Sequence, residues 1–562
     1  MSKTGVKYFI EQCKVNDLKN VVISPGSRNA PLTVAFSEDD FFNCISVPDE
    51  RSAAFIALGM AEQLNEPVAV LCTSGSALLN YAPAVSEAFY RSIPLVVISA
   101  DRPNMWVDQG DGQTIRQTGA LDNHLRFQTE LKEHLKDQND VWELCRKTDE
   151  ALQIAKQGNK GPVHINFPFT EPLYDAHEVE YDLQKNIQFV APKASFSAHQ
   201  LAHFKDIWES AEKRMIIVGQ MPVNPKLQAQ LVDLATDSST IVLVENTSNC
   251  THRSFVQCID RTLNSISSEE EKDFAPDLLI TIGGAVVSKR IKAFIRRNKV
   301  NHHWRINEQF NFMDTYQKLT ASFPMAAENF FDEMPLVKWT RNINNFGGKW
   351  KQLDLQVVAK HDAYFMDAPY ADMSVFEILL DYIPENSVLH FANSSVIRYA
   401  QLFDSIPSIE RYCNRGTSGI DGSTSTAVGA ALARPDKLHT LITGDISFFY
   451  DSNALWNNIL PSNLRVFLIN NEGGGIFKII PGPATTSALD EFFTTRHNTS
   501  AEHLCKAYDV NYFQADDLQK IDVQMEDFYS KLERPAIMEI FTPYQENDKV
   551  LKSYFDFVRV TK

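Results

Sequence analysis

Two apolar runs of the chain end in side chains that carry hard oxygen ligands. The run "LHTLITGD" ends in Asp445, and the next run, "NLRVFLINN", ends in Asn471 shortly before the glycines Gly473–Gly475. A carboxylate, an amide oxygen and a backbone carbonyl at the glycine-rich turn suit Mg²⁺, with three positions left for phosphate oxygens and water. The glycines let backbone approach phosphates without a Cβ in the way. The spacing therefore predicts a magnesium and phosphate site.

The fold has to bring Asp445 and Asn471 together, because they are too far apart in the sequence to share one helix face. We expect a strand over 438–445, a helix over 449–460 and a second strand over 463–471. A right-handed crossover makes these strands parallel. Both side chains then lie at the carboxyl edge of the sheet, where open α/β sheets bind ligands. Taken alone, the same residues also suit a helix cap and a turn.

Bulk properties narrow the class of protein. The 562 residues are too many for one core and suggest about three domains. A net charge of −17 argues against nucleic acid or an anionic membrane as the main partner. The sequence contains no run of about 18 apolar residues, so we expect no membrane insertion. The N-terminus lacks a signal-type apolar core, and we therefore expect a cytoplasmic protein. The eight cysteines include no C-x-x-C pair, which indicates neither a disulfide framework nor a zinc site.

Short β-rich runs alternate with helix-length amphipathic segments along the whole chain, which is typical of α/β domains with parallel sheets. A polar stretch near 175–200 and a second connection, rich in Asn, Lys and Gly, over about 335–370 separate three groups of these runs. We predict three doubly wound parallel-sheet domains, at 1–180, 195–335 and 370–562.

The segment from Gly444-Asp445 to Asn470-Asn471 resembles the cofactor motif of thiamine-diphosphate enzymes. Members of that family usually have Gly after the aspartate, where this chain has Ile446. The resemblance implies that Asp445, Asn471 and the Gly473 carbonyl hold a Mg²⁺ or Mn²⁺ ion that bridges the diphosphate. It also implies that Ile446 and Ser447 lie beside the cofactor. The predicted fold is accordingly of the thiamine-diphosphate-binding type.

Glu50, in "PDERSAAF", is the candidate for the glutamate that shares a proton with the aminopyrimidine ring of the cofactor. A carboxylate that merely stabilises a helix N-terminus is the alternative for this residue alone. In the family, the two cofactor-binding domains come from different subunits. The resemblance thus implies a homodimer or a dimer of dimers, with active sites at the subunit interface. Ile420 matches the bulky apolar residue that supports the bent cofactor.

Further motifs run in order across nearly the whole chain: "SPGSRNAPL", "TSGSALLNYAPAVSEA", "SADRP", "GQTIRQTG", "SKR", "ANSSVIR" and "NRGTSGIDG". Together they resemble the thiamine-dependent carboligases of menaquinone biosynthesis. The resemblance implies decarboxylation of 2-oxoglutarate and 1,4-addition of the resulting succinic semialdehyde–thiamine adduct to isochorismate. The alternatives are an acetolactate-synthase-like carboligase that uses pyruvate, an inactive cofactor-binding scaffold, and a flavin- or nucleotide-dependent oxidoreductase. The first would need fewer arginines, and the middle group lacks a G-x-G-x-x-G after a strand.

Both implied substrates are dicarboxylates, which guanidinium groups bind well. By resemblance, the isochorismate side comprises Arg28, Gln113, Lys289, Arg290 and Arg415, with Ser27 and Arg102 nearby. The oxoglutarate side or cofactor wall comprises Ser394, Arg398, Ile476 and Phe477. Ser394 and Arg398 are four residues apart, so we expect one helical turn to present both. The residues expected to be catalytic are Glu50, Arg28, Gln113 and Arg415. Gly112 stands where many members of that family have Asn, so a polar contact to one substrate is absent here or supplied by another residue.

Overall fold

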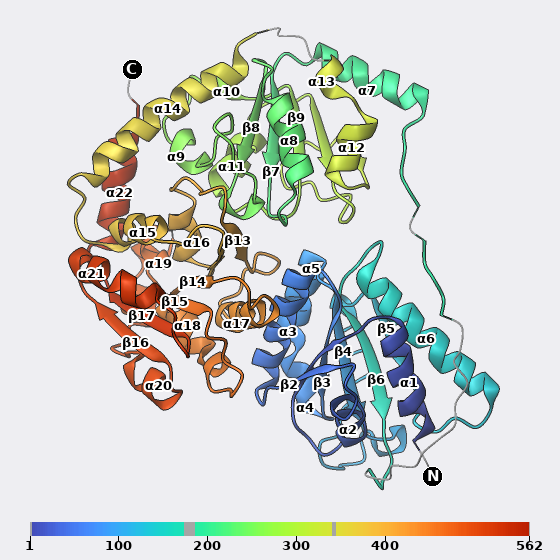
Figure 1. Cartoon of the computed structure of the whole chain (residues 1–562). Coiled ribbons are helices and arrows are strands. Elements are labelled where there is room, and N and C mark those ends of the chain that lie inside the picture. Colours follow the sequence, from blue (N-terminus) through green and yellow to red (C-terminus); the bar gives the residue numbers. More distant parts are fainter. Residues whose placement is uncertain (1–2, 174–185, 191, 340–343, 481, 561–562) are drawn as a thin grey trace.

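The computed structural model describes residues 3–173, 186–190, 192–339, 344–480 and 482–560. Its strands form three parallel sheets, and each sheet with its helices makes one α/β domain (Figure 1). The prediction of three doubly wound parallel-sheet domains is confirmed. The expected end of the first domain at residue 180 lies outside the described residues, as do the first two and last two residues of the chain.

The N-terminal domain contains a sheet in the order β2-β1-β3-β4-β6-β5. Its strands are β1 (Asn20–Ile23), β2 (Asn43–Ser46), β3 (Val68–Cys72), β4 (Leu95–Asp101), β5 (Phe127–Glu130) and β6 (Val163–Pro168). Its helices are α1 (Thr4–Val15), α2 (Ala30–Ser37), α3 (Glu50–Leu64), α4 (Ser76–Asn80), α5 (Ala82–Arg91) and α6 (Gln138–Lys156). Helix α3 begins where the Asp49 carboxylate accepts the Ser52 N–H, at 3.1 Å.

The middle domain has a sheet in the order β11-β10-β9-β7-β8. Its strands are β7 (Arg214–Val218), β8 (Thr240–Val244), β9 (Leu278–Ile282), β10 (His302–Ile306) and β11 (Ala321–Phe323). Its helices are α7 (Ala198–Ser210), α8 (Pro225–Leu234), α9 (Ile259–Leu263), α10 (Glu271–Phe274), α11 (Lys289–Arg297), α12 (Ala327–Glu333) and α13 (Leu336–Trp339).

The C-terminal domain has a sheet in the order β13-β12-β14-β15-β17-β16. Its strands are β12 (Val388–Phe391), β13 (Glu410–Cys413), β14 (His439–Gly444), β15 (Leu464–Asn470), β16 (Asn511–Ala515) and β17 (Ala536–Phe541). Its helices are α15 (Asp372–Asp381), α16 (Ser395–Ala400), α17 (Ser423–Ala433), α18 (Asp445–Tyr450), α19 (Ile476–Ile479), α20 (Glu502–Ala507), α21 (Leu518–Tyr529) and α22 (Asn547–Val558).

The helix α3 of the N-terminal domain packs directly on α17 of the C-terminal domain (Figure 1). A Cβ on Gly59 would lie 2.1 Å from the Thr426 carbonyl oxygen, and one on Gly429 would lie 2.0 Å from that of Ile56. The two helix backbones can approach this closely only because both positions are glycine. One apolar core therefore continues from the N-terminal domain into the C-terminal domain.

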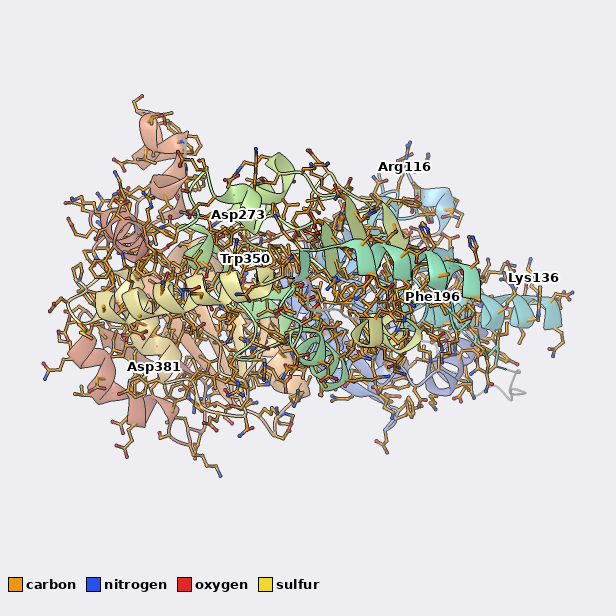
Figure 2. The ribbon with its side chains drawn as sticks, turned by 90° about the horizontal axis from the view of Figure 1, so that it is seen from above. Arg116, Lys136, Phe196, Asp273, Trp350 and Asp381 are labelled. Atoms are coloured by element: carbon orange, nitrogen blue, oxygen red, sulfur yellow. The ribbon has the colours of Figure 1, made fainter. Side chains whose placement is uncertain are left out.

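Two local predictions were wrong. The expected connection over 335–370 contains a long helix, α14 (Phe346–Phe365), which carries Trp350 (Figure 2). The buried Trp350 ring packs against Phe274. The buried positions of α14 follow a helical period that the many polar residues between them obscured. The helix expected over 449–460 is instead the shorter α18, followed by a 3₁₀ turn at Ser452–Leu455. The chain turns there because the buried Asp451 carboxylate accepts the N–H and hydroxyl of Ser425, both at 2.7 Å.

Candidate functional site

Asp445 and Asn471 meet at the carboxyl edge of the C-terminal sheet, as the crossover argument predicts. β14 and β15 are adjacent and parallel. Oδ2 of Asp445 accepts the backbone N–H of Asn471 at 3.2 Å and that of Gly473 at 2.8 Å. Oδ1 accepts the N–H of Ile446 at 2.6 Å. A carboxylate offers about four lone-pair sites, so one site on Oδ1 remains for a cation.

The two other expected ligands also keep acceptor capacity. The Asn471 side chain donates its NH₂ to Asp372 Oδ2 at 2.9 Å, and no described residue donates to its Oδ1. The Gly473 carbonyl accepts only the Gly475 N–H, at 2.9 Å, among the described residues, and a carbonyl has two lone pairs. One carboxylate, one amide and one carbonyl are a fitting donor set for Mg²⁺ or Mn²⁺. The described residues contain no cluster of three or more His, Cys, Asp or Glu suited to a metal, so this mixed set is the candidate centre.

His497 is a neighbour of this centre that the sequence did not suggest. Its Nε2 lies 3.4 Å from Asp445 Oδ2, and the contact with this carboxylate raises the pKa of the imidazole above its usual value. The ring also packs edge-on against Phe449. His497 is therefore a polar neighbour of Asp445 whose protonated form this carboxylate stabilises.

The loop that carries Arg415 and Ile420 is anchored on the same sheet edge. The Asn393 side chain donates to the carbonyls of Asn414 and Gly419, both at 2.7 Å, and accepts from Arg415 Nη1 at 2.8 Å. The Ser447 hydroxyl donates to the Ile420 carbonyl at 2.9 Å. The structure thus brings Arg415, Ile420 and Ser447 to the carboxyl ends of neighbouring strands, close to Asp445.

The remaining expected wall residues lie on the same edge. Ile476 is buried and opens α19, and Phe477 packs against Phe493 with ring centroids 5.5 Å apart. Arg398 lies on α16, whereas Ser394 precedes that helix with a left-handed φ of 71°. Ser394 and Arg398 are therefore not on one regular helical turn, contrary to the expectation. The positive φ turns Ser394 out of the helix register.

Basic side chains from the middle and C-terminal domains gather beside this edge. Arg398 and Arg415 interact electrostatically, and the buried Nε atoms of both have no hydrogen-bond partner in the described chain. Lys292 interacts electrostatically with Arg415 and with the buried Glu245, and its Nζ donates to the Val286 carbonyl at 2.6 Å. Burial lowers the pKa of Arg398 and that of Lys292. Desolvated cations that gather in this way are suited to bind anions.

Two carboxylates hold the start of α11, which carries Lys289 and Arg290. Glu245 accepts the N–H groups of Val287 and Ser288, at 2.6 and 2.7 Å, and burial raises its pKa to about 7. The Ser288 hydroxyl donates to Asp260. Lys289 is exposed at the first turn. Arg290 donates to Asn264 Oδ1 at 2.8 Å and lies over the Phe555 ring.

The N-terminal domain collects a second group at the carboxyl ends of β1, β3 and β4. Arg28 is buried, donates to the Phe169 carbonyl at 2.9 Å and pairs with Glu171 Oε1 at 2.9 Å. Ser27, beside it, is exposed. Arg102 pairs with Asp111 Oδ2 at 3.4 Å.

Gln113 lies next to Gly75 on the same edge. A Cβ on Gly75 would lie 3.3 Å from Gln113 Cα, and Gln113 itself has a left-handed φ of 55°. The buried Gln117 holds this pair in place: it accepts the Gly75 N–H at 2.8 Å and donates to the Ala100 carbonyl at 3.1 Å. The adjacent Arg116 instead points to the surface (Figure 2). Gly112 is exposed with open space around its Cα, so the absent Asn leaves no cavity.

Glu50 opens α3, as expected, and interacts electrostatically with Cys72 and Tyr81 of its own domain. Its neighbour Asp49 accepts from Asn453 at 2.6 Å. Among the described residues, no hydrogen bond or ion pair joins Glu50, Arg28 or Gln113 to the group around Asp445 and Arg415. These residues form two groups, which we call the Glu50 half-site at the edge of the N-terminal sheet and the Asp445 half-site at the edge of the C-terminal sheet.

The sequence did not single out Asp372, Glu87, Gln117, Glu245, Lys292 or His497. Each is a polar residue that interacts with a predicted site residue or with the segment that carries one. For Lys292 a signal existed, because it stands three residues after Lys289 on the same helix face. Glu87 and Gln117 lie within the quoted motifs "TSGSALLNYAPAVSEA" and "GQTIRQTG", which could have drawn attention to them. Asp372, Glu245 and His497 have no local pattern that distinguishes them from surface residues.

Comparison with known proteins identifies the class to which this three-domain fold and its sheet-edge site belong. Family models described as the N-terminal TPP binding domain of thiamine pyrophosphate enzymes, the middle domain of thiamine pyrophosphate, and the C-terminal TPP binding domain match residues 3–125, 178–390 and 395–540. The chain is a thiamine pyrophosphate enzyme, and thiamine diphosphate is its cofactor.

Close relatives show to which family of thiamine pyrophosphate enzymes the chain belongs. Proteins named 2-succinyl-5-enolpyruvyl-6-hydroxy-3-cyclohexene-1-carboxylate synthase from Flavobacterium johnsoniae and Christiangramia forsetii are 46% and 44% identical to it, over 97% of both chains in each case. The protein of that name from Porphyromonas gingivalis is 36% identical over 99% of this chain and 97% of its own. The chain belongs to this synthase family.

Solved structures support the fold. Benzoylformate decarboxylase from Polynucleobacter necessarius superposes with a TM-score of 0.72 at 16% identity, over 96% of this chain and 98% of its own. The thiamine diphosphate-dependent 4-hydroxybenzoylformate decarboxylase of Rhodococcus jostii gives a TM-score of 0.68 at 17% identity, over 96% and 99%. At such identities the likeness concerns the fold alone. In the described residues, no helix combines the length and apolarity needed to cross a membrane.

Proposed function

We propose that the enzyme decarboxylates 2-oxoglutarate and adds the remaining four-carbon unit to isochorismate, giving CO₂ and 2-succinyl-5-enolpyruvyl-6-hydroxy-3-cyclohexene-1-carboxylate in menaquinone biosynthesis. The observation that carries this proposal is the group formed by Arg398, Arg415 and Lys292, with the unpartnered buried Nε atoms of its arginines. Two dianionic substrates need such a group, whereas a donor as small as pyruvate does not. The name shared by the relatives supports the same reaction.

The cofactor residues act by binding and by moving one proton. Asp445, Asn471 and the Gly473 carbonyl would hold Mg²⁺ or Mn²⁺ against the diphosphate, and Ile420, Ile446, Ser447, Ser394, Ile476 and Phe477 would line the bound cofactor. When bound, thiamine diphosphate supplies a nucleophilic carbon and an electron sink for the loss of CO₂. Glu50 would hold the proton that activates the aminopyrimidine, because a carboxyl group at that position can exchange a proton within hydrogen-bond reach.

The substrate residues act by charge and orientation. We assign Ser27, Arg28, Arg102, Gln113, Lys289, Arg290 and Arg415 to isochorismate, and Ser394, Arg398 and Phe477 to 2-oxoglutarate. Arg28 is already bound to Glu171, so a substrate carboxylate has to displace that carboxylate or share the guanidinium with it. Guanidinium forks orient carboxylates through paired hydrogen bonds, each worth about 1.5–3 kcal/mol.

No hydrogen bond or ion pair between described residues joins the two half-sites within one chain. This supports assembly as a homodimer, or a dimer of dimers, in which the Glu50 half-site of one protomer faces the Asp445 half-site of its partner. We also propose that the enzyme is cytoplasmic, and that its domains span 1–180, 195–335 and 370–562.

The decisive experiment uses purified protein, thiamine diphosphate and Mg²⁺ with both substrates. Isochorismate loss is followed by absorbance and the adduct is identified by mass, with pyruvate replacing 2-oxoglutarate in the control. Adduct formed only with 2-oxoglutarate is the expected result. CO₂ released from pyruvate, with no adduct from 2-oxoglutarate, would overturn the substrate assignment and leave the cofactor site standing.

A further inference from the structure

Asp372, the first residue of α15, makes a buried contact with the candidate metal centre. Its carboxylate is almost fully excluded from solvent and lies far from Asn471 in the sequence. Oδ2 accepts the NH₂ of the Asn471 side chain at 2.9 Å. The described contacts of Asp372 do not include a basic side chain, so this carboxylate is not held by an ion pair.

The contact has a chemical consequence for Asn471. A primary amide presents an oxygen on one side and an NH₂ group on the other, and only the oxygen can bind a cation. An ionised carboxylate only accepts hydrogen bonds. Asp372 therefore requires the NH₂ of Asn471 to face it, and the amide oxygen has to face the opposite way. Without such a partner the amide is free to turn over.

Asp372 is itself held in place from two further directions. The Thr542 hydroxyl, just after β17, donates to Oδ1 at 2.6 Å. The Asp372 backbone N–H donates to Asn547 Oδ1, at the start of α22, at 2.9 Å. Each carboxylate oxygen thus has one dedicated donor, and the side chain cannot rotate without breaking a buried hydrogen bond.

We infer that Asp372 is a positioning residue, which orients the Asn471 amide so that its oxygen rather than its NH₂ group is offered to the metal ion. This inference rests on the proposed role of Asn471 as a metal ligand. Partners that orient the ligands of a metal typically change its affinity by about 10–100-fold when they are removed.

The test measures Mn²⁺ binding to the full-length protein in saturating thiamine diphosphate, from the free-ion signal in electron paramagnetic resonance. Asp372→Ala should weaken Mn²⁺ binding by about tenfold or more. Asp372→Asn removes the charge but keeps an oxygen that can accept from Asn471, while its own NH₂ donates to the Thr542 hydroxyl. It should bind Mn²⁺ within about threefold of the wild type, if the amide orientation and not the charge matters.

A double-mutant cycle separates orientation from general damage. If Asp372 acts through Asn471, then Asp372→Ala should have little further effect on Mn²⁺ binding in an Asn471→Ala background. Thermal melting of every variant shows whether it is folded, and Asp372→Asn, which is nearly isosteric, carries the comparison should Asp372→Ala fail to fold.

The outcomes separate this inference from the proposal on which it rests. If the wild type and Asn471→Ala bind Mn²⁺ equally, the metal role of Asn471 falls and the inference falls with it. If only Asn471→Ala is impaired, and Asp372→Ala binds as the wild type does, the inference alone is overturned. Equal losses in Asp372→Asn and Asp372→Ala would assign the effect to charge and would also overturn it.

Discussion

Glu87 of the N-terminal domain accepts both the backbone N–H and the hydroxyl of Thr417, at 2.6 and 2.9 Å from the same carboxylate oxygen. Its other oxygen accepts the Gly416 N–H at 2.8 Å. Gly416 and Thr417 directly follow Arg415. Helix α5 of the N-terminal domain therefore holds the loop of the C-terminal domain that carries Arg415, a proposed substrate-binding residue.

Glu87→Gln should loosen this loop. A glutamine has one acceptor oxygen, so it cannot accept both N–H groups, and a buried donor without a partner costs about 1–3 kcal/mol. We expect the KM for isochorismate to rise about tenfold while the affinity for thiamine diphosphate stays unchanged. Steady-state kinetics and cofactor titration measure the two quantities. Thr417→Val removes only the hydroxyl contact and should have a smaller effect. An unchanged KM in Glu87→Gln would show that the loop does not depend on this anchor.

Glu50→Gln tests the proposed proton transfer. The side chain keeps its size, so folding and Mg²⁺ binding should stay close to those of the wild type. Loss of a positioned acid–base group should lower kcat by about 10²–10⁴-fold. Single-turnover kinetics with saturating cofactor give the rate, and circular dichroism checks the fold. Near-normal turnover would remove Glu50 from the mechanism.

Gly75→Ala tests the packing behind Gln113. Gly75 has a φ of 94°, and a Cβ there would lie 3.3 Å from Gln113 Cα. An L-residue in this conformation costs about 1–3 kcal/mol, so we expect a lower melting temperature and a displaced Gln113 with reduced kcat/KM. Gly112→Ala is the matched control, since a Cβ at that position meets no atom within 4 Å. Similar losses in both variants would show that the effect does not depend on the conformation and packing of Gly75.

The stability of the protein should depend on pH through the buried Asp451. Burial raises the pKa of this carboxyl to about 7 in spite of the two hydrogen bonds from Ser425. The pKa of Asp451 in the folded protein lies above its pKa in the unfolded chain. The contribution of Asp451 to the free energy of unfolding is therefore fully present below about pH 4 and is lost as the pH rises through 7. Between pH 5 and 8 the melting temperature of the wild type should therefore fall relative to that of Asp451→Asn, which does not titrate there. Parallel curves for the two proteins would contradict the pKa assignment.

Much of the fold follows from local patterns. Strands such as β3 are continuous apolar runs because parallel strands are covered on both faces, and helices on either side complete the doubly wound domains. Asp445 and Asn471 stand at strand ends, and the right-handed crossover rule then places them on one edge. The same reasoning missed α14, whose buried positions are helically spaced but separated by many polar residues.

The sequence by itself determined which chemical groups stand at the ends of which strands, because the residue types and the strand periodicity are local properties of the chain. Only the tertiary structure decided which partners orient these groups. Asp372 reaches Asn471, Glu87 reaches Thr417 and Gln117 reaches Gly75 across many intervening residues. Contacts at such separations depend on how whole domains pack, and domain packing leaves no periodic trace in the sequence around either partner.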